Sequence, residues 1–256
     1  MPAALVTGGG TRLGKAMALY LAQRGYDVAV HYNSSAEGAE NVAAACGGTS
    51  VALQADLLDE AQTSALLPEA AKQLGQPISV LVNNASIFEY DTVETATKDS
   101  WDRHMGSNLR APFVLTQALA QQAPAAGVDE NGESIANALI VNMLDQRVRK
   151  LTPEFMTYTL AKMGLWAFTQ TAAMGLAPHV RVNAIGPGPT LQGTRQSDAH
   201  FKGQRSNTVL KRGANPSDIT AALGYFLDAP AVTGQLLCVD GGQHIGWKTQ
   251  DILGVE

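Results

Sequence analysis

The sequence predicts an α/β fold, a doubly wound seven-stranded parallel sheet with helices on both faces. Two observations carry this prediction. Short apolar runs alternate with segments of helical periodicity along the chain, which is the pattern of repeated strand–helix–strand units. The run from Ile78 to Val82 is almost continuously apolar, as expected of a strand that is covered on both faces. Because no linker, repeat or low-complexity segment interrupts the alternation, we expect residues 1–256 to form one domain.

Composition excludes several functional classes. A net charge of -5 argues against a nucleic-acid partner, which requires a basic face. The two cysteines, Cys46 and Cys238, fit neither a disulfide framework nor zinc-ligand spacing, and the five histidines are scattered, so we expect no metal site. The N-terminus does not resemble a signal peptide, and no apolar stretch approaches the roughly 18 residues of a membrane span. We expect a cytoplasmic protein with reduced, buried thiols and no membrane partner.

The first strand and helix flank a glycine-rich turn. Residues 3–7 form an apolar run that ends in Gly8-Gly9-Gly10, and apolar residues then recur at helical spacing from Arg12 to Arg24. Glycines let the backbone approach a ligand closely, and a helix N-terminus presents unpaired N–H groups to an anion such as a pyrophosphate. Three glycines are also compatible with a simple tight turn. The strand expected at Asp27–Tyr32 favours the dinucleotide cradle of a Rossmann fold.

The segment after the second strand indicates which dinucleotide is bound. It reads His31-Tyr32-Asn33-Ser34-Ser35 and has no carboxylate, whereas NAD-binding folds place an acidic residue there for the ribose hydroxyls. Arg12 can supply a cation, and Asn33, Ser34 and Ser35 can donate hydrogen bonds to a 2′-phosphate. The alternative is that Arg12 faces solvent and Ser34 caps the helix that ends at Ala45. The two roles of Ser34 are compatible, and we infer NADP(H).

Polar residues follow the next two strands. Asp56 comes after the strand at residues 50–54 and is placed either to accept from an adenine amine or to cap the helix at residues 60–74. The strand at residues 78–82 ends at Asn83-Asn84-Ala85-Ser86. Both segments lie at carboxyl ends of strands, where doubly wound folds bind ligands.

A long helix is expected from Asp99 to Gln122. Pro112 implies a kink or a break within it. Asn108 lies near its middle, where a buried asparagine either satisfies local backbone groups or holds a water near the site.

The last third of the chain continues the alternation. The remaining predicted elements are an exposed loop at residues 125–134, strands at 138–143, 180–185 and 235–239, and helices at about 153–176 and at 218–227. Residues 190–207 have no clear periodicity and follow the carboxyl end of a strand, which is the place of a substrate lid.

Three titratable residues converge on the strand and helix between residues 138 and 176. Tyr158 and Lys162 are four residues apart, so they share one face of the helix. A nearby ammonium favours phenolate, and we expect the pKa of Tyr158 to fall. Asp145 follows the preceding strand and can reach the same place, which suggests acid–base chemistry. The alternative for Asp145 is a helix N-cap or a salt bridge with Arg147 or Arg149.

These residues together resemble the short-chain dehydrogenase/reductase family over the whole chain. The matching motifs are Thr7-Gly8-x-x-x-Arg12-x-Gly14, Asn83-Asn84-Ala85, Asn108, Tyr158-x-x-x-Lys162 and Pro187-Gly188. The family usually has a serine thirteen residues before the tyrosine, and this chain has Asp145 there. An aspartate at that position, Ser86 and Phe88 after the Asn-Asn-Ala motif, and the His31-Tyr32-Asn33-Ser34 segment are similar to the pteridine reductase branch. Two departures are Ser34, where that branch often has arginine, and Glu89, where it tends to have tyrosine.

The resemblance implies a role for each matching residue. Catalysis would fall to Asp145, Tyr158, Lys162 and Asn108, and substrate binding to Arg12, Ser86, Phe88, Asp145 and Tyr158. NADP(H) would contact Gly8, Arg12, Leu13, Tyr32, Asn33, Ser34, Ser35, Asp56, Leu57, Asn84, Ala85, Ser86, Lys162, Pro187 and Gly188. Phe88 would stack on a flat pterin ring against the nicotinamide. Family practice also implies a homotetramer built through the helices around Val114 and Trp166.

Three functional hypotheses follow. The first is an NADPH-dependent reductase of a pterin or dihydrofolate-type ring, because reducing a ring C=N needs a proton on nitrogen, which a carboxyl group can donate and a serine donates poorly. The second is a carbonyl or alcohol oxidoreductase of the same family, which Glu89 and Ser34 keep open. The third is a protein that senses NADP(H) without turnover; it has no need of Tyr158, Lys162 and Asn108 together.

Overall fold

The computed structural model describes residues 1–193 and 196–248. A parallel seven-stranded sheet with the order β3-β2-β1-β4-β7-β8-β9 forms its centre. The strands are β1 Ala3–Val6, β2 Asp27–Tyr32, β3 Val51–Gln54, β4 Ile78–Asn83, β7 Ala138–Met143, β8 Val180–Pro187 and β9 Leu236–Val239. The predicted doubly wound sheet is therefore confirmed.

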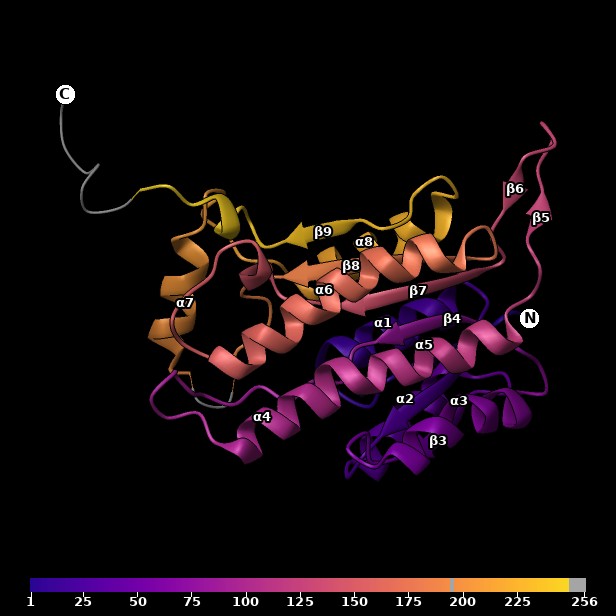
Figure 1. Ribbon diagram of the computed structural model, residues 1–256, viewed down its shortest axis with the longest axis horizontal. Helices are drawn as coiled ribbons and strands as arrows, with labels where there is room; N and C mark the ends of the chain where they lie inside the picture. Colours follow the sequence, from indigo (N-terminus) through magenta and orange to yellow (C-terminus); the bar gives the residue numbers. More distant parts are fainter. Residues whose placement is uncertain (194–195, 249–256) are drawn as a thin grey trace.

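Helices cover both faces of the sheet because successive strand residues point to opposite sides. In β1, Ala4 and Val6 enter the core cluster with α1, α2 and α8, whereas Ala3 and Leu5 enter the cluster with α3, α5 and α6. The bounds of these helices are α1 Arg12–Gln23, α2 Ala36–Cys46, α8 Pro216–Asp228, α3 Glu60–Leu74, α5 Ala111–Gln122 and α6 Met156–Leu176. Figure 1 shows α5 and α6 running across the front of the sheet.

The order of the strands creates a crevice at their carboxyl ends. The chain runs outward from β1 through β2 to β3 and then returns to β4 on the other side of β1. The connections that leave β1 and β4 therefore diverge, and this is where doubly wound folds bind ligands. In Figure 1 the strand arrows point toward α7, Asp198–Ser206, which lies beyond their ends.

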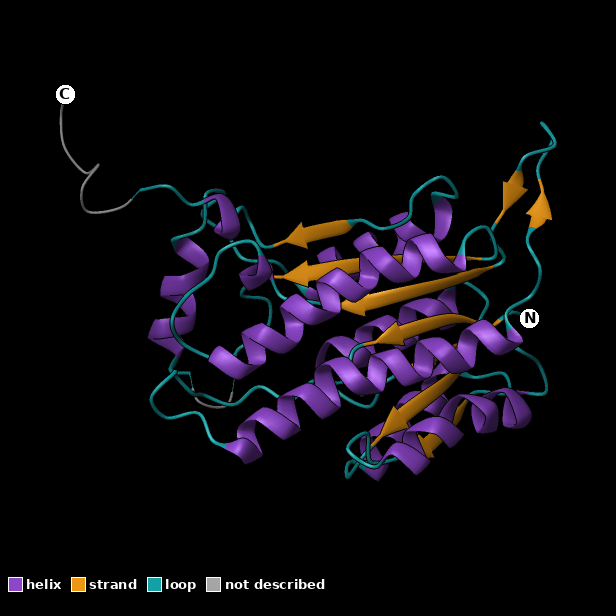
Figure 2. Ribbon diagram, in the orientation of Figure 1, coloured by secondary structure: helices purple, strands orange, loops and turns teal. Residues whose placement is uncertain are grey.

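The predicted long helix continues through Pro112 without a break. It consists of α4, Lys98–Met105, a π-helical turn at Gly106–Arg110, and α5, and Figure 2 shows it as one uninterrupted rod. Proline has no N–H to donate to the carbonyl four residues earlier, which here belongs to Asn108. The wider turn accommodates this missing bond, and π-helical turns are frequent at functional sites.

Three local predictions need correction. Residues 190–207 were expected to be irregular, yet they contain α7, which begins after Ser197, whose hydroxyl accepts from the N–H of His200. The exposed loop at residues 125–134 contains a short hairpin, β5 Gly127–Val128 with β6 Ser134–Ile135, at the other end of the sheet from α7 (Figure 1). Helix α6 begins at Met156 and not near Pro153, because Phe155 has a left-handed backbone with φ 55°.

Cys46 and Cys238 are free and only partly buried, so the expectation of buried thiols was too strong. Within residues 1–193 and 196–248, none of the helices combines the length and the apolar character that crossing a membrane requires.

Candidate functional site

The glycine-rich turn after β1 is shaped for close approach of a ligand. Gly8 has φ 61°, a conformation that favours glycine. A Cβ atom at Gly14 would lie 2.1 Å from the carbonyl oxygen of Gly8, so any side chain there would force the turn open. The first turn of α1 has no acidic residue, and the side chain of its N-cap residue, Thr11, makes no capping hydrogen bond. The N-terminal N–H groups of α1 therefore face a space suited to an anion.

Thr7 and Asn84 fasten this turn to the end of β4. The hydroxyl of Thr7 accepts from the N–H groups of Asn84 and Ala85, each at 2.9 Å. The side-chain amide of Asn84 donates to the carbonyls of Thr7, at 2.9 Å, and Gly8, at 3.2 Å. The Asn-Asn-Ala motif thus has a clear physical task, which is to hold the floor of the crevice rigid.

His31 holds the turn from the side of β2. Its Nδ1 accepts from the N–H of Gly8 at 3.0 Å, and its Nε2 lies 3.0 Å from the carbonyl of Ala55. A backbone N–H only donates and a carbonyl only accepts, so the ring is neutral with its proton on Nε2. Burial lowers the pKa of His31, which favours this neutral form.

Arg12 links the turn to the segment after β8. Its guanidinium donates to the carbonyls of Leu191, at 3.0 Å, and Gln192, at 2.9 Å. Arg12 lines the cleft, and its hydrogen bonds tie the turn to the polypeptide that leads into α7. Its contact with a 2′-phosphate stays a prediction.

The residues after β2 lie along one part of the cleft. Tyr32, Asn33, Ser34 and Ser35 all line the cleft. Ser35, rather than Ser34, is the N-cap residue of α2, and its side chain makes no capping hydrogen bond. The hydroxyl of Ser34 therefore does not have the capping role that was its alternative.

Asp56 does not cap the helix that follows it. Asp59 is the N-cap residue of α3, and its carboxylate accepts from Ala61 and Gln62. Asp56 instead accepts from the N–H of Leu58 at 2.9 Å and lines the cleft beside Leu57.

Asp145, Tyr158 and Lys162 meet at the carboxyl end of β7. The hydroxyl of Tyr158 donates to Oδ2 of Asp145 at 3.1 Å, while Oδ1 of Asp145 accepts from the N–H of Arg147 at 2.8 Å and so caps a short 3₁₀ turn. The buried Nζ of Lys162 donates to the carbonyl of Met143 at 2.7 Å and lies 5.6 Å from the centre of the Tyr158 ring. Asp145 therefore has the capping role that was its alternative, through Oδ1, and contacts Tyr158 through Oδ2, while its acid–base role stays a prediction.

The pKa of Tyr158 moves in the opposite direction to the prediction. Burial raises the pKa of Tyr158 well above its ordinary value, and the neighbouring carboxylate of Asp145 raises it further. Burial also lowers the pKa of Lys162 to about 8. The phenol is therefore held protonated, because the carboxylate accepts directly from its hydroxyl whereas the ammonium is bonded to the carbonyl of Met143.

Phe88 forms an aromatic wall of the cleft. One face of its ring stacks on Phe155, with 4.3 Å between centroids and 7° between planes, and it also meets the Tyr158 ring edge at 4.7 Å. Phe88 is 45% exposed and lines the cleft, as does the neighbouring Ser86. The departure at Glu89 is paired with Arg103, which also lines the cleft, at 2.9 Å.

Asn108 acts on the polypeptide beside this wall. Its Oδ1 accepts from the N–H of Ile87 and its Nδ2 donates to the carbonyl of Ile87, both at 2.8 Å. Asn108 is fully buried, and Ile87 rather than Asn108 lines the cleft. The side chain thus satisfies backbone groups, which was one of its two predicted roles.

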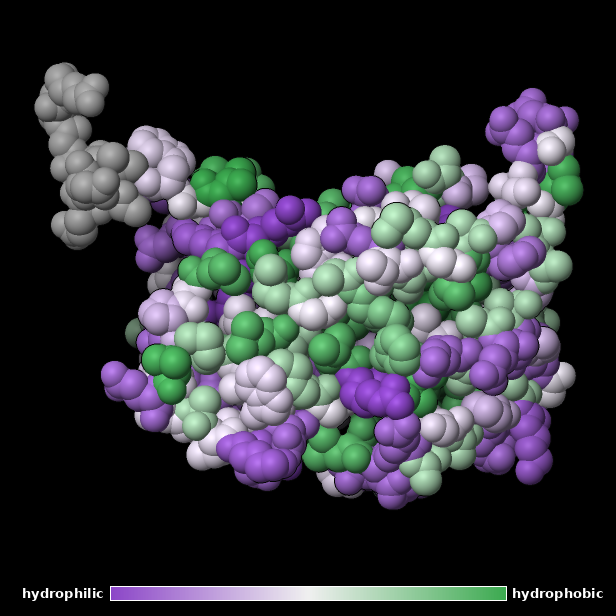
Figure 3. Space-filling view, viewed as in Figure 1, coloured by the Kyte–Doolittle hydropathy of each residue, from purple (hydrophilic) through white to green (hydrophobic). Residues whose placement is uncertain are grey.

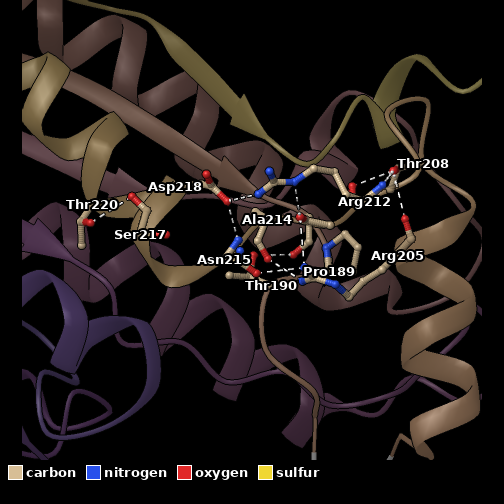
Figure 4. Close-up of polar contacts among 12 residues, drawn as sticks. Pro189, Thr190, Arg205, Thr208, Arg212, Ala214, Asn215, Ser217, Asp218 and Thr220 are labelled. Carbon is tan, nitrogen blue, oxygen red and sulfur yellow. Dashed lines mark hydrogen bonds and ion pairs between the residues drawn. The ribbon is translucent and has the colours of Figure 1, made fainter.

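Helix α7 closes one side of the cleft and is anchored at its C-terminal end. Arg205 donates to the carbonyls of Pro189, at 2.9 Å, and Ala214, at 2.6 Å, and to the side chain of Asn215, at 2.9 Å (Figure 4). Phe201, from α7, lines the cleft. The carboxyl end of β8, α7 and the start of α8 are therefore held as one unit.

The cleft joins nearly all of the predicted site. It has a volume of about 830 Å³, and every predicted catalytic, cofactor or substrate residue except Asn108 lines it, including Leu13, Pro187 and Gly188. Among residues 1–193 and 196–248, no group of three or more His, Cys, Asp or Glu side chains is arranged to hold a metal ion. Sequence reasoning missed the contributions of Arg103, Gln146, Gln196, Phe201, Gln204 and Gln243.

Comparison with known proteins identifies similar chains. Residues 10–244 match the family model described as enoyl-(acyl carrier protein) reductase. FolM alternative dihydrofolate reductase 1 from Brucella suis in complex with NADP is 40% identical, with a TM-score of 0.90 and 98% of each chain covered. The Brucella canis protein complexed with NADP is 38% identical, with a TM-score of 0.89 and 99% of this chain and 98% of that chain covered. The 3-oxoacyl-[acyl-carrier-protein] reductase FabG of Staphylococcus aureus is 30% identical over 94% of this chain and 98% of its own length.

Proposed function

The chain belongs to the short-chain dehydrogenase/reductase family, and we propose that it is an NADPH-dependent reductase of a pterin or dihydrofolate-type ring. The observation that carries the proposal is the hydrogen bond between Tyr158 and Asp145 at 3.1 Å. It places a carboxyl group and a protonated phenol together in the cleft, beside the aromatic wall of Phe88. The similarity to the two Brucella dihydrofolate reductases supports the same substrate class.

The cofactor of this proposal is NADP(H), which the Brucella enzymes bind. The strongest fit is the tight glycine-rich turn, where even one added carbon at Gly14 would meet the backbone. The N-terminus of α1 would hold the pyrophosphate, and Asn33, Ser34 and Ser35 would donate to the 2′-phosphate. Lys162 would hold the nicotinamide ribose. When bound, the reduced nicotinamide supplies a hydride to a carbon of the ring.

The residues of the chain supply the proton and the geometry. Phe88 provides a flat apolar face on which a conjugated ring can stack. The phenol of Tyr158 is protonated at neutral pH because burial and Asp145 raise its pKa, so it can donate a hydrogen bond to an edge of the substrate. Asp145, whose Oδ2 accepts from the Tyr158 hydroxyl, can pass the proton of that hydroxyl to the ring nitrogen next to the reduced carbon, so that one hydride and one proton complete the reduction of a C=N bond and the phenol is left deprotonated. General acids of this kind contribute about 10²- to 10⁴-fold to rates.

The test is a screen of NADPH oxidation with dihydrobiopterin, dihydromonapterin, dihydrofolate and simple carbonyls. We expect turnover with one or more of the pterin or folate substrates and much slower turnover with NADH. Turnover of 3-oxoacyl or quinone carbonyls without turnover of any pterin or folate would overturn the assignment of the substrate.

The second candidate is a carbonyl reductase of the same family. It is favoured by the 30% identity to FabG, a 3-oxoacyl-[acyl-carrier-protein] reductase. An Asp145→Ser variant separates the two candidates. Activity on pterins should collapse if Asp145 delivers the proton, and activity on carbonyls should hold or rise if the site is built for a C=O group.

The proposal extends to assembly and location. We place the protein in the cytoplasm, where its two free cysteines would stay reduced. We also propose a homotetramer formed through α5 and α6. Green and pale residues gather over these helices in Figure 3, and the exposed apolar side chains there are Phe113, Leu160 and Met174. Light scattering of the purified protein tests this, and a monomeric mass would refute it.

A further inference from the structure

Three buried polar side chains form a chain of contacts behind the aromatic wall. Asp91, His104 and Thr157 are 3%, 0% and 1% exposed. His104 belongs to α4, Thr157 to the first turn of α6, and Asp91 to the segment that carries Phe88. Burying polar groups to this degree costs free energy unless they are hydrogen-bonded, so each of these side chains needs a partner inside the protein.

The donor and acceptor in each of these hydrogen bonds follow from the N–H of Glu89, which can only donate, and the carboxylate of Asp91, which accepts. The backbone N–H of Glu89 donates to Nε2 of His104 at 3.1 Å. The neutral ring therefore carries its proton on Nδ1, which lies 2.7 Å from Oγ1 of Thr157 and donates to it. The hydroxyl of Thr157 in turn donates to the carboxylate of Asp91.

Asp91 anchors the start of α6 from outside the helix. Helix α6 has no side-chain cap of its own, because its N-cap position is Phe155 in a left-handed conformation. The carbonyl of Asp91 accepts from the N–H of Met156 at 3.3 Å, and Oδ1 of Asp91 accepts from the N–H of Thr157 at 3.1 Å. The hydroxyl of Ser100, on α4, donates a further hydrogen bond to Oδ2 of Asp91 at 3.2 Å.

The segment between Phe88 and Asp91 is thus clamped at both ends. His104 holds the backbone at Glu89, and α6 holds the backbone and side chain of Asp91. Phe88 is the residue directly before the first clamp, and its ring is pressed on Phe155, directly before α6. The plane of the Phe88 ring therefore depends on a bond made by a histidine that does not line the cleft.

We propose that His104 is a positioning residue that sets the plane of Phe88 for stacking on the substrate ring, through its hydrogen bond from the N–H of Glu89. This proposal rests on the proposed function, in which Phe88 contacts a flat heteroaromatic substrate. His104 is not a catalytic residue in this account, because it acts only through the backbone at Glu89.

The clamp formed by Asp91, His104 and Thr157 requires a neutral imidazole at His104. A second proton would go to Nε2 and would face the N–H of Glu89, so the bond would be lost. The charged and titratable groups around the ring are the carboxylates of Asp91 and Glu89, which favour protonation, the guanidinium of Arg103, which opposes it, and the phenol of Tyr158, 6.0 Å between ring centroids. Burial outweighs the carboxylates and lowers the pKa of His104. The clamp is therefore intact at neutral pH and weakens as the pH falls below the ordinary range of histidine.

Two uncharged variants distinguish the hydrogen bond at Nε2 of His104 from the hydrogen bond at Nδ1. In His104→Gln, the side-chain oxygen can occupy the place of Nε2 and accept from Glu89. In His104→Asn, the shorter amide can occupy the place of Nδ1 and donate to Thr157 but cannot reach Glu89. We expect His104→Asn to raise KM for the dihydropterin about tenfold, the size of one lost hydrogen bond, with KM for NADPH unchanged. We expect His104→Gln to keep KM for the dihydropterin close to that of the wild type at neutral pH. In the wild type this KM should rise at acidic pH, as His104 is protonated, and in His104→Gln it should not rise. Equal KM values for the dihydropterin in the two variants would overturn the proposal.

Amide hydrogen exchange provides a readout that does not depend on turnover. The Glu89 amide should be protected in the wild type and in His104→Gln, and exposed in His104→Asn. Protection should fall on acidification in the wild type and stay constant in His104→Gln. If the protein reduces no pterin or folate but these exchange patterns appear, the clamp stands and the proposed function fails. If the Glu89 amide exchanges alike in both variants, the clamp itself is refuted.

Discussion

Replacing Asp145 with asparagine is the most direct test of the chemistry. In the structure, Oδ1 of Asp145 caps the N–H of Arg147 at 2.8 Å, and Oδ2 accepts from Tyr158 at 3.1 Å. Asparagine has the same shape and is about as good an N-cap residue as aspartate. The substitution therefore preserves the fold of the site and removes only the ability to carry a proton.

The size of the expected loss follows from this separation. Removing a general acid lowers rates by about 10²- to 10⁴-fold, which corresponds to roughly 3 to 5.5 kcal/mol in the barrier. The free energy of unfolding should change by less than about 1 kcal/mol, because the cap remains. Losing the carboxylate also removes one of the causes that raise the pKa of Tyr158, so the phenol should titrate at a lower pH in the variant.

The assay is single-turnover oxidation of NADPH with a saturating dihydropterin, together with titration of NADPH binding by fluorescence and unfolding by urea. We expect Asp145→Asn to bind NADPH normally and unfold normally while the rate of the chemical step collapses. A variant that reduces the dihydropterin at the wild-type rate would show that Asp145 serves only as a cap, and the proton would need another source.

Three further predictions concern the cofactor. Gly14→Ala should abolish NADPH binding, because its Cβ would lie 2.1 Å from the carbonyl oxygen of Gly8. The control Gly175→Ala, with nothing within 4 Å of the added Cβ, should keep NADPH binding and raise the free energy of unfolding in urea by up to about 1 kcal/mol. Equal NADPH binding by both variants would contradict a cofactor site at the glycine-rich turn. Because the pKa of Lys162 is about 8, its ammonium is lost above that pH, and NADPH affinity should weaken as the pH rises through about 8. Lys162→Met should bind NADPH weakly at every pH. A wild-type Kd for NADPH that stays constant in this range would argue against contact between Lys162 and the cofactor. Ser34→Asp should weaken NADPH binding at least about tenfold by repulsion and leave NADH binding unchanged, and an equal loss for both cofactors would speak against a 2′-phosphate at this position.

The sheet and most of the cleft could be predicted because their signals are local. A buried parallel strand is an apolar run that ends in a polar or glycine-bearing turn, and the cleft is built from these turns. Helix α7 was missed for a related reason. It is polar and short, has no buried residue, and is held by Arg205 through carbonyls distant in sequence, so no apolar period marks it.

The parts of the site that could not be predicted depend on non-local distances. Four-residue spacing places Lys162 beside Tyr158, but it does not show that the ammonium bonds to Met143 while the phenol bonds to a carboxylate. The sign of the pKa shift at Tyr158 follows from those two bonds and from burial. The clamp of Asp91, His104 and Thr157 joins three elements, and none of the three residues stands out in the sequence.

The β5–β6 hairpin offers a practical handle on the molecule. Its turn is self-contained, since Oδ1 of Asp129 accepts from the N–H groups of Asn131 and Glu133, each at 2.8 Å, and Gly132 has φ 81°. Exposed turns of this kind tolerate insertions, and this one lies at the opposite end of the sheet from α7 (Figure 1). A fluorophore or affinity tag inserted after Asn131 would leave the cleft facing solution, so that ligand binding could be followed on immobilised protein.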